Sequence, residues 1–203
     1  MSVTLAIIVL TTVVSWLAWS RPGLLDRLIL WPPAITRGRE YWRLLSSGLI
    51  HADLGHLAFN MITLYFFGGV IERFLSMRVG AVGFALFYAV GLVVSSLPSW
   101  WRHRQDAGYR SLGASGAVSA VLFAFVLLQP WAMILVFFVR MPSIVYAALY
   151  LAYTIYMDRR RSDHINHSAH LWGAIYGMAV TVMIEPRVPA VFLQQLLRPS
   201  FGI

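Results

Sequence analysis

The sequence of 203 residues contains no cysteine and no lysine, and it carries few charges of any kind. Without cysteine there are no disulfides, no thiolate metal ligands and no cysteine nucleophile. Charged residues make up 12% of the chain, far below the roughly 25% of an average globular domain. Hydrophobic residues make up 59%. This composition is that of an integral membrane protein. Because cysteine is absent, any chemistry must rest on Ser, His, Asn or carboxylate side chains.

The apolar residues fall into runs that approach the roughly 20 residues needed to cross a hydrocarbon core. These runs predict an all-α bundle of six membrane helices in a single domain, residues 1–203. The first run could also be a signal peptide, but residues 1–4 lack the positive charge with which such peptides begin. The six expected helices cover residues 3–19, 54–74, 79–97, 113–129, 142–157 and 168–184.

Two connecting segments have a composition of their own. Residues 20–47 mix helix-breaking prolines with Trp and Tyr, which favours a loop lying at the membrane surface. Residues 131–139 are apolar but too short to cross the bilayer, and they predict an interfacial or re-entrant connection.

The fourth run opens with the sequence Gly113-Ala114-Ser115-Gly116. A serine framed by glycines at a helix start exposes its hydroxyl beside the free N–H groups of the helix N-terminus, where an oxyanion could bind. Small residues also pack membrane helices together, and Gly116 and Ala120 lie on one helical face. Taken alone, the motif favours packing, so a catalytic interpretation requires a partner for the serine.

His170 is the candidate partner, because an ionisable side chain within a membrane helix is costly and commonly marks a functional site. Gly173 and Gly177 follow on the same broad face and would allow this helix to approach the Ser115 helix closely. A Ser–His pair is an established way of activating a hydroxyl group. The alternative is a histidine that only joins helices through a hydrogen bond.

His56 and Asn60 lie one helical turn apart and therefore point the same way. Two donors on one face could stabilise negative charge on a carbonyl oxygen, or they could simply bond neighbouring helices. His51 carries a weaker signal and could be an interfacial loop residue.

Taken together, these residues resemble the rhomboid family of intramembrane serine proteases, in its bacterial form. The resemblance implies that Ser115 and His170 form a catalytic dyad and that His56, Asn60 and the Ser115 N–H bind the oxyanion. It also implies six helices around a water-accessible cavity, with the first loop partly embedded in the membrane. The supporting motif positions are Trp42, Arg43, His51, Glu72, Arg73, Gly113, Gly116, Ala169, Gly173 and Gly177.

One position departs from the family pattern. Some rhomboids carry an aromatic residue one turn after the nucleophile, packed on the catalytic histidine, where this chain has Ser119. Another residue must then hold the imidazole, and Trp172 is a candidate. No carboxylate lies within an expected helix near His170, which favours a dyad over a triad.

Other chemistries find little support. A zinc protease would show His-Glu-x-x-His, and an aspartyl protease would show paired membrane aspartates, and the chain has neither. His164, His167 and His170 are evenly spaced but lack a carboxylate or thiolate partner, so we expect no metal and no cofactor. A non-catalytic rhomboid-like protein that binds client helices remains the main alternative, and a transporter is a weaker one.

The expected partners are single-span membrane proteins and the bilayer, not nucleic acid, although the net charge is +8. Orientation gives conflicting signals. Most arginines lie in the loops at the Ser115 end, which would place that end in the cytoplasm. The family resemblance implies the inner membrane of a bacterial cell with the active site facing the extracytoplasmic side, and we adopt that expectation.

Overall fold

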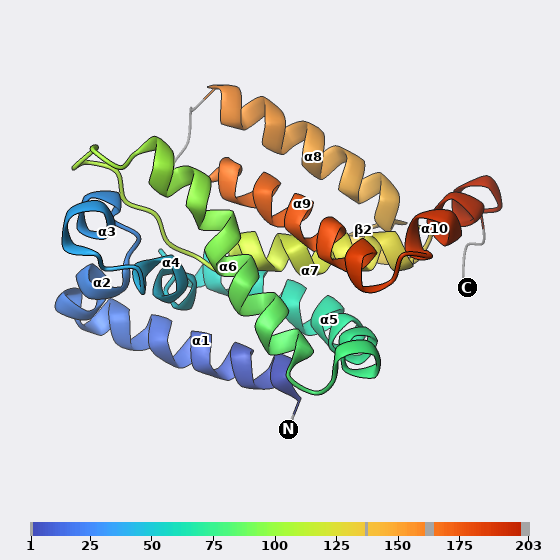
Figure 1. The fold of residues 1–203 in the computed structure, drawn as a ribbon, viewed down its shortest axis with the longest axis horizontal. Helices are drawn as coiled ribbons and strands as arrows, with labels where there is room; N and C mark the ends of the chain where they lie inside the picture. The colour runs from blue at the N-terminus through green and yellow to red at the C-terminus, as the bar shows by residue number, and fades with distance from the viewer. Residues whose placement is uncertain (1, 137, 161–164, 200–203) are drawn as a thin grey trace.

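The computed structural model describes residues 2–136, 138–160 and 165–199, and it is a mostly helical bundle (Figure 1). Each of the six expected segments coincides with a helix. The helices are α1 (Val3–Ser20), α5 (Leu54–Val79), α6 (Gly83–Arg102), α7 (Ser115–Leu128), α8 (Ser143–Arg160) and α9 (His167–Ile184).

Length and composition qualify three of these helices, α1, α5 and α6, as candidate membrane spans. A fourth candidate is the pair formed by α9 and α10 (Val188–Leu197), which is bent by 109° at a short break. The apolar α7 is shorter than a full span. The helices are therefore found where the apolar runs predicted them, whereas a count of six spans stays a prediction.

The expected boundary between the second and third helices lay too early. Helix α5 continues to Val79, and the chain then turns at Gly80, whose φ of 86° is in the region that glycine adopts readily. Helix α6 consequently begins at Gly83 and runs on through Pro98 to Arg102. The apolar run had not revealed the final, more polar turns of either helix.

The long first connection is folded into short helices. These are α2 (Pro22–Leu28), α3 (Pro32–Gly38), α4 (Arg43–Ser46) and the 3-10 turn η1 (Ser47–Leu49). Proline at the first turn starts both α2 and α3, where its missing N–H costs nothing. Buried Leu30, Ile35 and Leu44 form one cluster with Leu97 on α6, so this connection packs on the bundle.

A small antiparallel hairpin joins α7 to α8, which an all-α description does not include. Strands β1 (Met133–Val136) and β2 (Val139–Pro142) pair with Met133 opposite Pro142. The pairing satisfies backbone groups of a segment that is too short to cross the membrane, in line with its expected role as a connection. Ser143, the first residue of α8, also bonds the carbonyl oxygens of Gln129 and Pro130.

Helix α1 is fastened to α5 by a carboxylate. Glu72 accepts hydrogen bonds from the N–H groups of Val3 and Thr4, at 2.7 and 2.9 Å, and from the Thr4 hydroxyl at 2.6 Å. Gly68, one turn earlier, provides the space into which Thr4 fits. The Glu72 side chain thus caps the N-terminus of α1 with negative charge, which favours a helix start.

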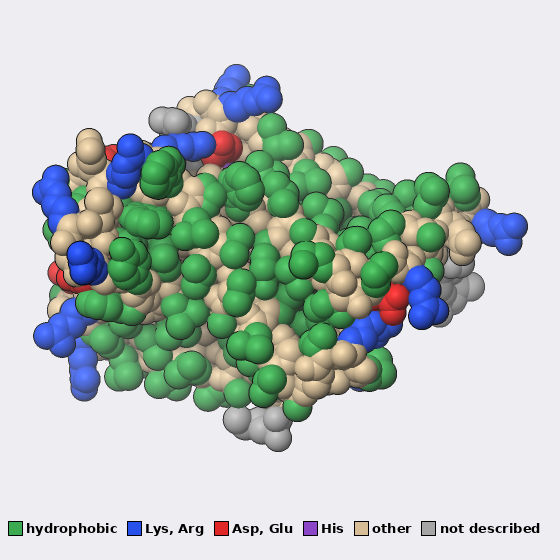
Figure 2. Space-filling model, viewed as in Figure 1, with side chains coloured by type: hydrophobic (Ala, Val, Ile, Leu, Met, Phe, Trp, Pro, Cys, Tyr) green, Lys and Arg blue, Asp and Glu red, His purple; other side chains and the backbone are tan. Residues whose placement is uncertain are grey.

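Helix α7 forms the centre of the bundle and is buried along almost its whole length. It contacts α5, α6 and, most extensively, α9. In Figure 1, α8 and α1 lie along opposite edges of the bundle. Figure 2 shows hydrophobic side chains across the broad middle of the visible face and arginines gathered towards its ends, as expected for a protein surrounded by lipid.

Candidate active site

The loop before α7 is held by two backbone bonds. The Gly113 N–H donates to the Ser47 carbonyl at 2.9 Å, and the Ala114 N–H donates to Nε2 of His51 at 3.3 Å. Gly113 has a φ of 115°, a conformation that side chains disfavour, and a Cβ there would lie 2.6 Å from Cε1 of His56. Glycine is therefore required at this position for both backbone shape and space.

His51 is the residue whose importance the sequence understated. Its ring is fully buried, and since Nε2 accepts from Ala114, Nδ1 carries the proton and donates to the Ser15 hydroxyl at 3.1 Å. The hydroxyl of Ser15 in turn donates to the Leu49 carbonyl. Burial, with a smaller contribution from the neighbouring His56, lowers the pKa of His51 to about 3. A neutral His51 thus ties α1 to the loop that precedes Ser115.

Ser115 is the first residue of α7 and is partly exposed. The cap position before it holds Ala114, which has no side-chain acceptor for the first N–H groups of the helix. An α-helix leaves these groups without intrahelical partners, and its dipole places partial positive charge at the same end. The Ser115 hydroxyl therefore stands beside a helix end suited to an anionic oxygen.

Helices α7 and α9 meet through glycines, as their spacing predicted. A Cβ on Gly173 would collide with the Gly116 carbonyl, and one on Gly177 would collide with the Ala120 carbonyl. A Cβ on Gly116 would lie 3.3 Å from the Ala169 carbonyl oxygen. Because Gly116 follows Ser115 and Ala169 precedes His170, the turns that carry the two candidate residues face each other.

Tyr150 of α8 packs on His170. The two rings are stacked with their centroids 5.9 Å apart and an interplanar angle of 24°. The hydroxyl of Tyr150 lies 2.7 Å from that of Ser119, one turn after Ser115. The aromatic neighbour of His170 therefore comes from another helix, while Trp172 leaves 44% of its surface exposed. No pattern within α7 or α9 could have indicated Tyr150.

His56 and Asn60 occupy the start of α5. Asp53 caps this helix by accepting the His56 N–H at 2.8 Å, and the half-buried His56 ring lies edge-on to that of His51, with centroids 4.9 Å apart. The buried Asn60 amide donates to the His56 carbonyl at 2.9 Å. His56 thus lies against Gly113, next to the start of α7, whereas Asn60 bonds within its own helix.

Arg43 and Trp42 behave differently from each other. Buried Arg43 binds Glu40 at 2.6 Å and donates to the carbonyls of Asp26 and Ile29 at 2.7 and 2.9 Å, so it fixes the first connection internally. Trp42 is 57% exposed. Of the two, Arg43 has a clear structural role.

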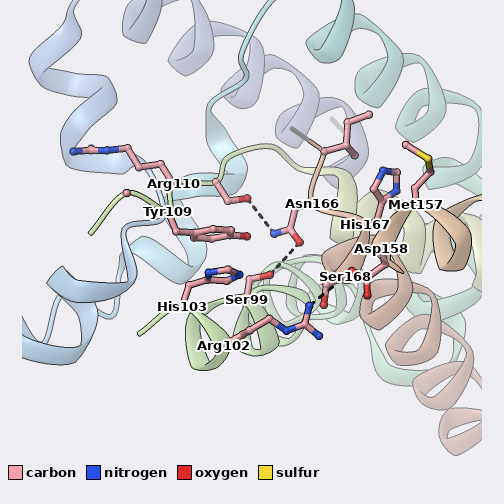
Figure 3. A pocket seen from close by; sticks show the side chains of 13 residues that line it. Ser99, Arg102, His103, Tyr109, Arg110, Met157, Asp158, Asn166, His167 and Ser168 are labelled. Carbon is pink, nitrogen blue, oxygen red and sulfur yellow. Dashed lines mark hydrogen bonds and ion pairs between the residues drawn. The ribbon is translucent and has the colours of Figure 1, made fainter. Parts of the chain in front are cut away.

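A cavity of about 330 Å³ (Figure 3) is lined by the C-terminal end of α6, the start of α9 and the loop that leads towards Ser115. Asn166, just before α9, bridges its walls by donating to the Ser111 hydroxyl at 3.1 Å and accepting from the Ser99 hydroxyl at 3.0 Å. Asn166 also caps α9 by accepting the Ala169 N–H. His167 and Ser168, in the first turn of α9, line the same cavity. A largely polar space therefore adjoins the helix end that carries His170.

Of the three evenly spaced histidines, His164 lies outside the described residues. His167 and His170 contact each other with ring centroids 5.7 Å apart. Within the described part of the chain, no group of three or more His, Cys, Asp or Glu side chains could hold a metal ion.

Comparison with known proteins gives a consistent result. A family model described as the rhomboid domain matches residues 38–187. The putative rhomboid protease YdcA of Bacillus subtilis is 27% identical over 176 residues, which cover 84% of this chain and 82% of that protein.

Two further similar proteins are longer than this chain. The mitochondrial RHOMBOID-like protein 12 of Arabidopsis thaliana is 29% identical over 173 residues, 79% of this chain and 51% of that protein. The rhomboid protease GlpG of Photorhabdus laumondii is 29% identical over 110 residues, 54% of this chain and 32% of that protein. The matches thus span about half or less of these two relatives.

Proposed function

This chain is a multi-pass membrane protein of the rhomboid family, and from that premise we propose that it is an intramembrane serine endopeptidase in which Ser115 and His170 form a catalytic dyad. The observation that carries the proposal is the glycine-mediated contact of α7 with α9, which sets the turns bearing Ser115 and His170 against each other. The protease names of several relatives support the same reaction class.

The proposed reaction begins with proton transfer from the Ser115 hydroxyl to the His170 imidazole as the oxygen attacks a peptide carbonyl. The tetrahedral intermediate collapses when the C–N bond breaks and His170 returns the proton to the departing amine. The acyl group then remains on Ser115 as an ester. Water, deprotonated by His170, hydrolyses this ester and releases the carboxylate product, which restores the hydroxyl group.

The negative charge of the intermediate would develop at the start of α7. The N–H of Ser115 and the His56 ring are the proposed donors, since His56 lies against Gly113 and the helix end carries no side-chain cap. We assign Asn60 to the same function by family resemblance. Its present bond to the His56 carbonyl would orient its amide and brace the turn that presents His56.

A dyad rather than a triad agrees with the positions of the described carboxylates. Asp53 is engaged with the His56 N–H, and Asp158 lies 3.9 Å from Arg102. Asp163 falls outside the described residues. The groups around the His170 ring include the Tyr150 and His167 rings, so aromatic packing would take over the orienting role that a carboxylate has in a triad.

We further propose that the Ser115 end faces outward from the bacterial inner membrane. The count of arginines argues the other way, but several of them are bound within the fold. Arg43 is buried in the first connection, and Arg110 lies 3.3 Å from Asp26. We therefore give Arg43, which is committed to the fold, less weight than the exposed loop arginines, and we follow the family resemblance over the plain count.

The proposed substrates are single-span membrane proteins cut near the membrane boundary. In this proposal the polar cavity beside the start of α9 would supply the water for hydrolysis of the ester on Ser115, because water is needed for deacylation and is scarce in the hydrocarbon core. Substrate helices would unwind at segments of small, flexible residues, and such an unwound segment would fit into this site.

The test uses a fluorophosphonate, which reacts covalently with activated serines, and a mixture of single-span proteins reconstituted with the enzyme in liposomes. We expect labelling and cleavage by the unmodified chain and neither by Ser115→Ala or His170→Ala. Ser119→Ala is the matched control, because it removes a hydroxyl from the same helix one turn away and should still be labelled.

The main alternative is a family member that binds client helices without cutting them. It would bind the same single-span proteins equally well before and after Ser115→Ala while producing no fragments and no labelling. A fragment that disappears with Ser115→Ala excludes this alternative, whereas unlabelled, uncleaving protein that still captures clients would overturn the peptidase proposal.

A further inference from the structure

A second cavity, of about 740 Å³, lies at the opposite end of the bundle from Ser115. Helices α5, α7 and α9 all begin at the Ser115 end, and the cavity is lined by the last turns of α5 and α7, by the residues that follow α9 and by the start of α10. We call it the basal cavity. Its charged lining residues are Arg73, Arg78, Glu185 and Arg187, and its apolar ones include Val70, Met77, Leu127 and Val191.

The charges of the basal cavity do not balance. Glu185 is shared by two arginines, lying 3.2 Å from a terminal nitrogen of Arg78 and 3.4 Å from Nε of Arg187. Arg73 forms no ion pair with another described residue. Three guanidinium groups therefore line a space that contains one carboxylate, and the surplus positive charge would attract an anion.

Arg78 is held in place, whereas Arg187 remains open to solvent. Arg78 also donates to the Phe74 carbonyl at 3.3 Å, and its guanidinium lies 4.0 Å from the centre of the Phe74 ring. The Arg187 side chain is 88% exposed. One fixed guanidinium beside an accessible one can receive an incoming oxyanion through charge-assisted hydrogen bonds.

The depth of the basal cavity in the membrane indicates which kind of anion it would bind. The ends of apolar membrane helices lie at the level of the lipid headgroups. Helix α10 leaves α9 at a bend of 109° and keeps large apolar side chains exposed, with Leu193 at 57% and Leu197 at 75%. A helix of this kind is suited to lying along the membrane surface. The cavity is thus a basic opening with an apolar wall at the depth of the phosphate groups.

We propose that the basal cavity binds an anionic phospholipid. The phosphate would lie among Arg73, Arg78 and Arg187, and an acyl chain would follow the apolar wall that includes Val70 and Leu127. Basic recesses between helix ends are suited to anionic headgroups, and the wall adds the apolar burial that a free phosphate could not use. The site is separate from Ser115, and its occupancy does not depend on peptidase activity.

The experiment measures the thermal melting temperature of the detergent-purified chain with added phosphatidylglycerol, phosphatidylcholine or inorganic phosphate. A ligand that binds only the folded state raises the melting temperature. We expect phosphatidylglycerol to raise the melting temperature by at least about 3 °C. In a chain of this size, such a shift corresponds to a lipid concentration roughly ten times the dissociation constant of the site. Phosphatidylcholine and inorganic phosphate should raise it by less than half as much.

Replacing arginines inside and outside the cavity distinguishes binding at this site from a general attraction of anionic lipid to a basic protein. The double variant Arg73→Gln/Arg187→Gln should lose most of the melting-temperature shift. Arg73→Gln alone should lose part of the shift, and it serves as the test if the double variant fails to fold. Arg140→Gln is the matched control, because this arginine lies in the hairpin that follows α7 and does not line the cavity. An equal phosphatidylglycerol shift in all variants would overturn the site. An equal shift with inorganic phosphate would overturn its assignment to a lipid.

Discussion

Tyr150 and His170 come from neighbouring helices and stack with their ring centroids 5.9 Å apart. The Tyr150 hydroxyl is held by Ser119, the residue that replaces an aromatic found in some rhomboids. The small side chain on α7 and the large one on α8 thus form a complementary pair. This arrangement supplies the histidine with an aromatic surface from a helix that otherwise lies at the edge of the bundle.

Replacing Tyr150 should slow the proposed reaction without weakening substrate binding. In Tyr150→Leu the His170 ring loses its stacking partner, and a displaced base lowers kcat by about 10- to 100-fold. Tyr150→Phe keeps the ring and loses only the bond to Ser119, so most of the activity should remain. Cleavage in liposomes gives kcat and KM separately.

Ser119→Ala is the matched variant for the hydroxyl bond and should behave as Tyr150→Phe does. An increase in KM with unchanged kcat in Tyr150→Leu would assign Tyr150 to substrate contact instead of to histidine positioning.

The glycine contacts between α7 and α9 should tolerate no methyl group. In Gly177→Ala the new Cβ would meet the Ala120 backbone, which cannot move aside as a flexible side chain can. We expect the free energy of unfolding to fall by about 2 kcal/mol or more, with loss of serine labelling. Denaturation followed by helix circular dichroism measures the change.

Gly69→Ala is the corresponding control, since a Cβ there meets nothing within 4 Å. This variant should be as stable as the parent or up to about 1 kcal/mol more stable, because alanine favours a helix interior. Equal effects of the two substitutions would mean that the α7–α9 contact is not tight.

His51 should make the fold sensitive to acid. Its pKa is about 3 in the folded chain and 6.5 ordinarily, because burial opposes the charged ring. The stability that neutral His51 contributes is therefore complete above pH 6.5 and is lost as the pH falls towards 3. Across this window the melting temperature should drop by about 3 to 5 °C per pH unit.

His51→Gln offers an amide oxygen to the Ala114 N–H and cannot be protonated, so its melting temperature should depend less on pH than that of the parent. His103→Gln provides the control, because this histidine lies outside the bundle core, beside Asp106. A parent chain and His51→Gln with the same pH dependence would contradict the role of His51.

Orientation can be mapped cleanly because the chain has no cysteine. We expect Gln105→Cys, in the connection before Ser115, to react with an impermeant maleimide in intact cells. Ala81→Cys, in the turn at the other end, should react only after the membrane is opened. The reverse pattern would support the orientation that the arginine count favours.

The helix positions could be predicted because an apolar run of sufficient length has few alternatives in a membrane. The close contact of α7 with α9 was also predictable, since Gly173 and Gly177 recur on one helical face. The C-terminal end of α5 was missed because charged residues, Arg78 among them, interrupt its apolar run. The hairpin was missed because its pairing depends on residues at both ends of a short segment.

The surroundings of His170 and His51 were beyond the sequence for a different reason. Tyr150 is one of several tyrosines on α8, and only the packing of that helix decides which of them reaches the imidazole. His51 belongs to no periodic pattern, and its burial follows from where α1 and the α7 loop meet. Contacts between segments that are distant in the chain produce no regular spacing in the sequence from which they could be predicted.

Ala114, which precedes Ser115, affects the stability of α7 at the end where the proposed reaction takes place. Ser or Asp at such a helix start would stabilise the resting fold by about 1 kcal/mol over alanine, and Ala114 forgoes that contribution. In the proposed reaction, the N–H groups at this helix end would gain a negative partner only when a substrate carbonyl becomes an oxyanion. An inhibitor that presents a charged oxygen at that point should therefore stabilise the whole helix, and with it the fold.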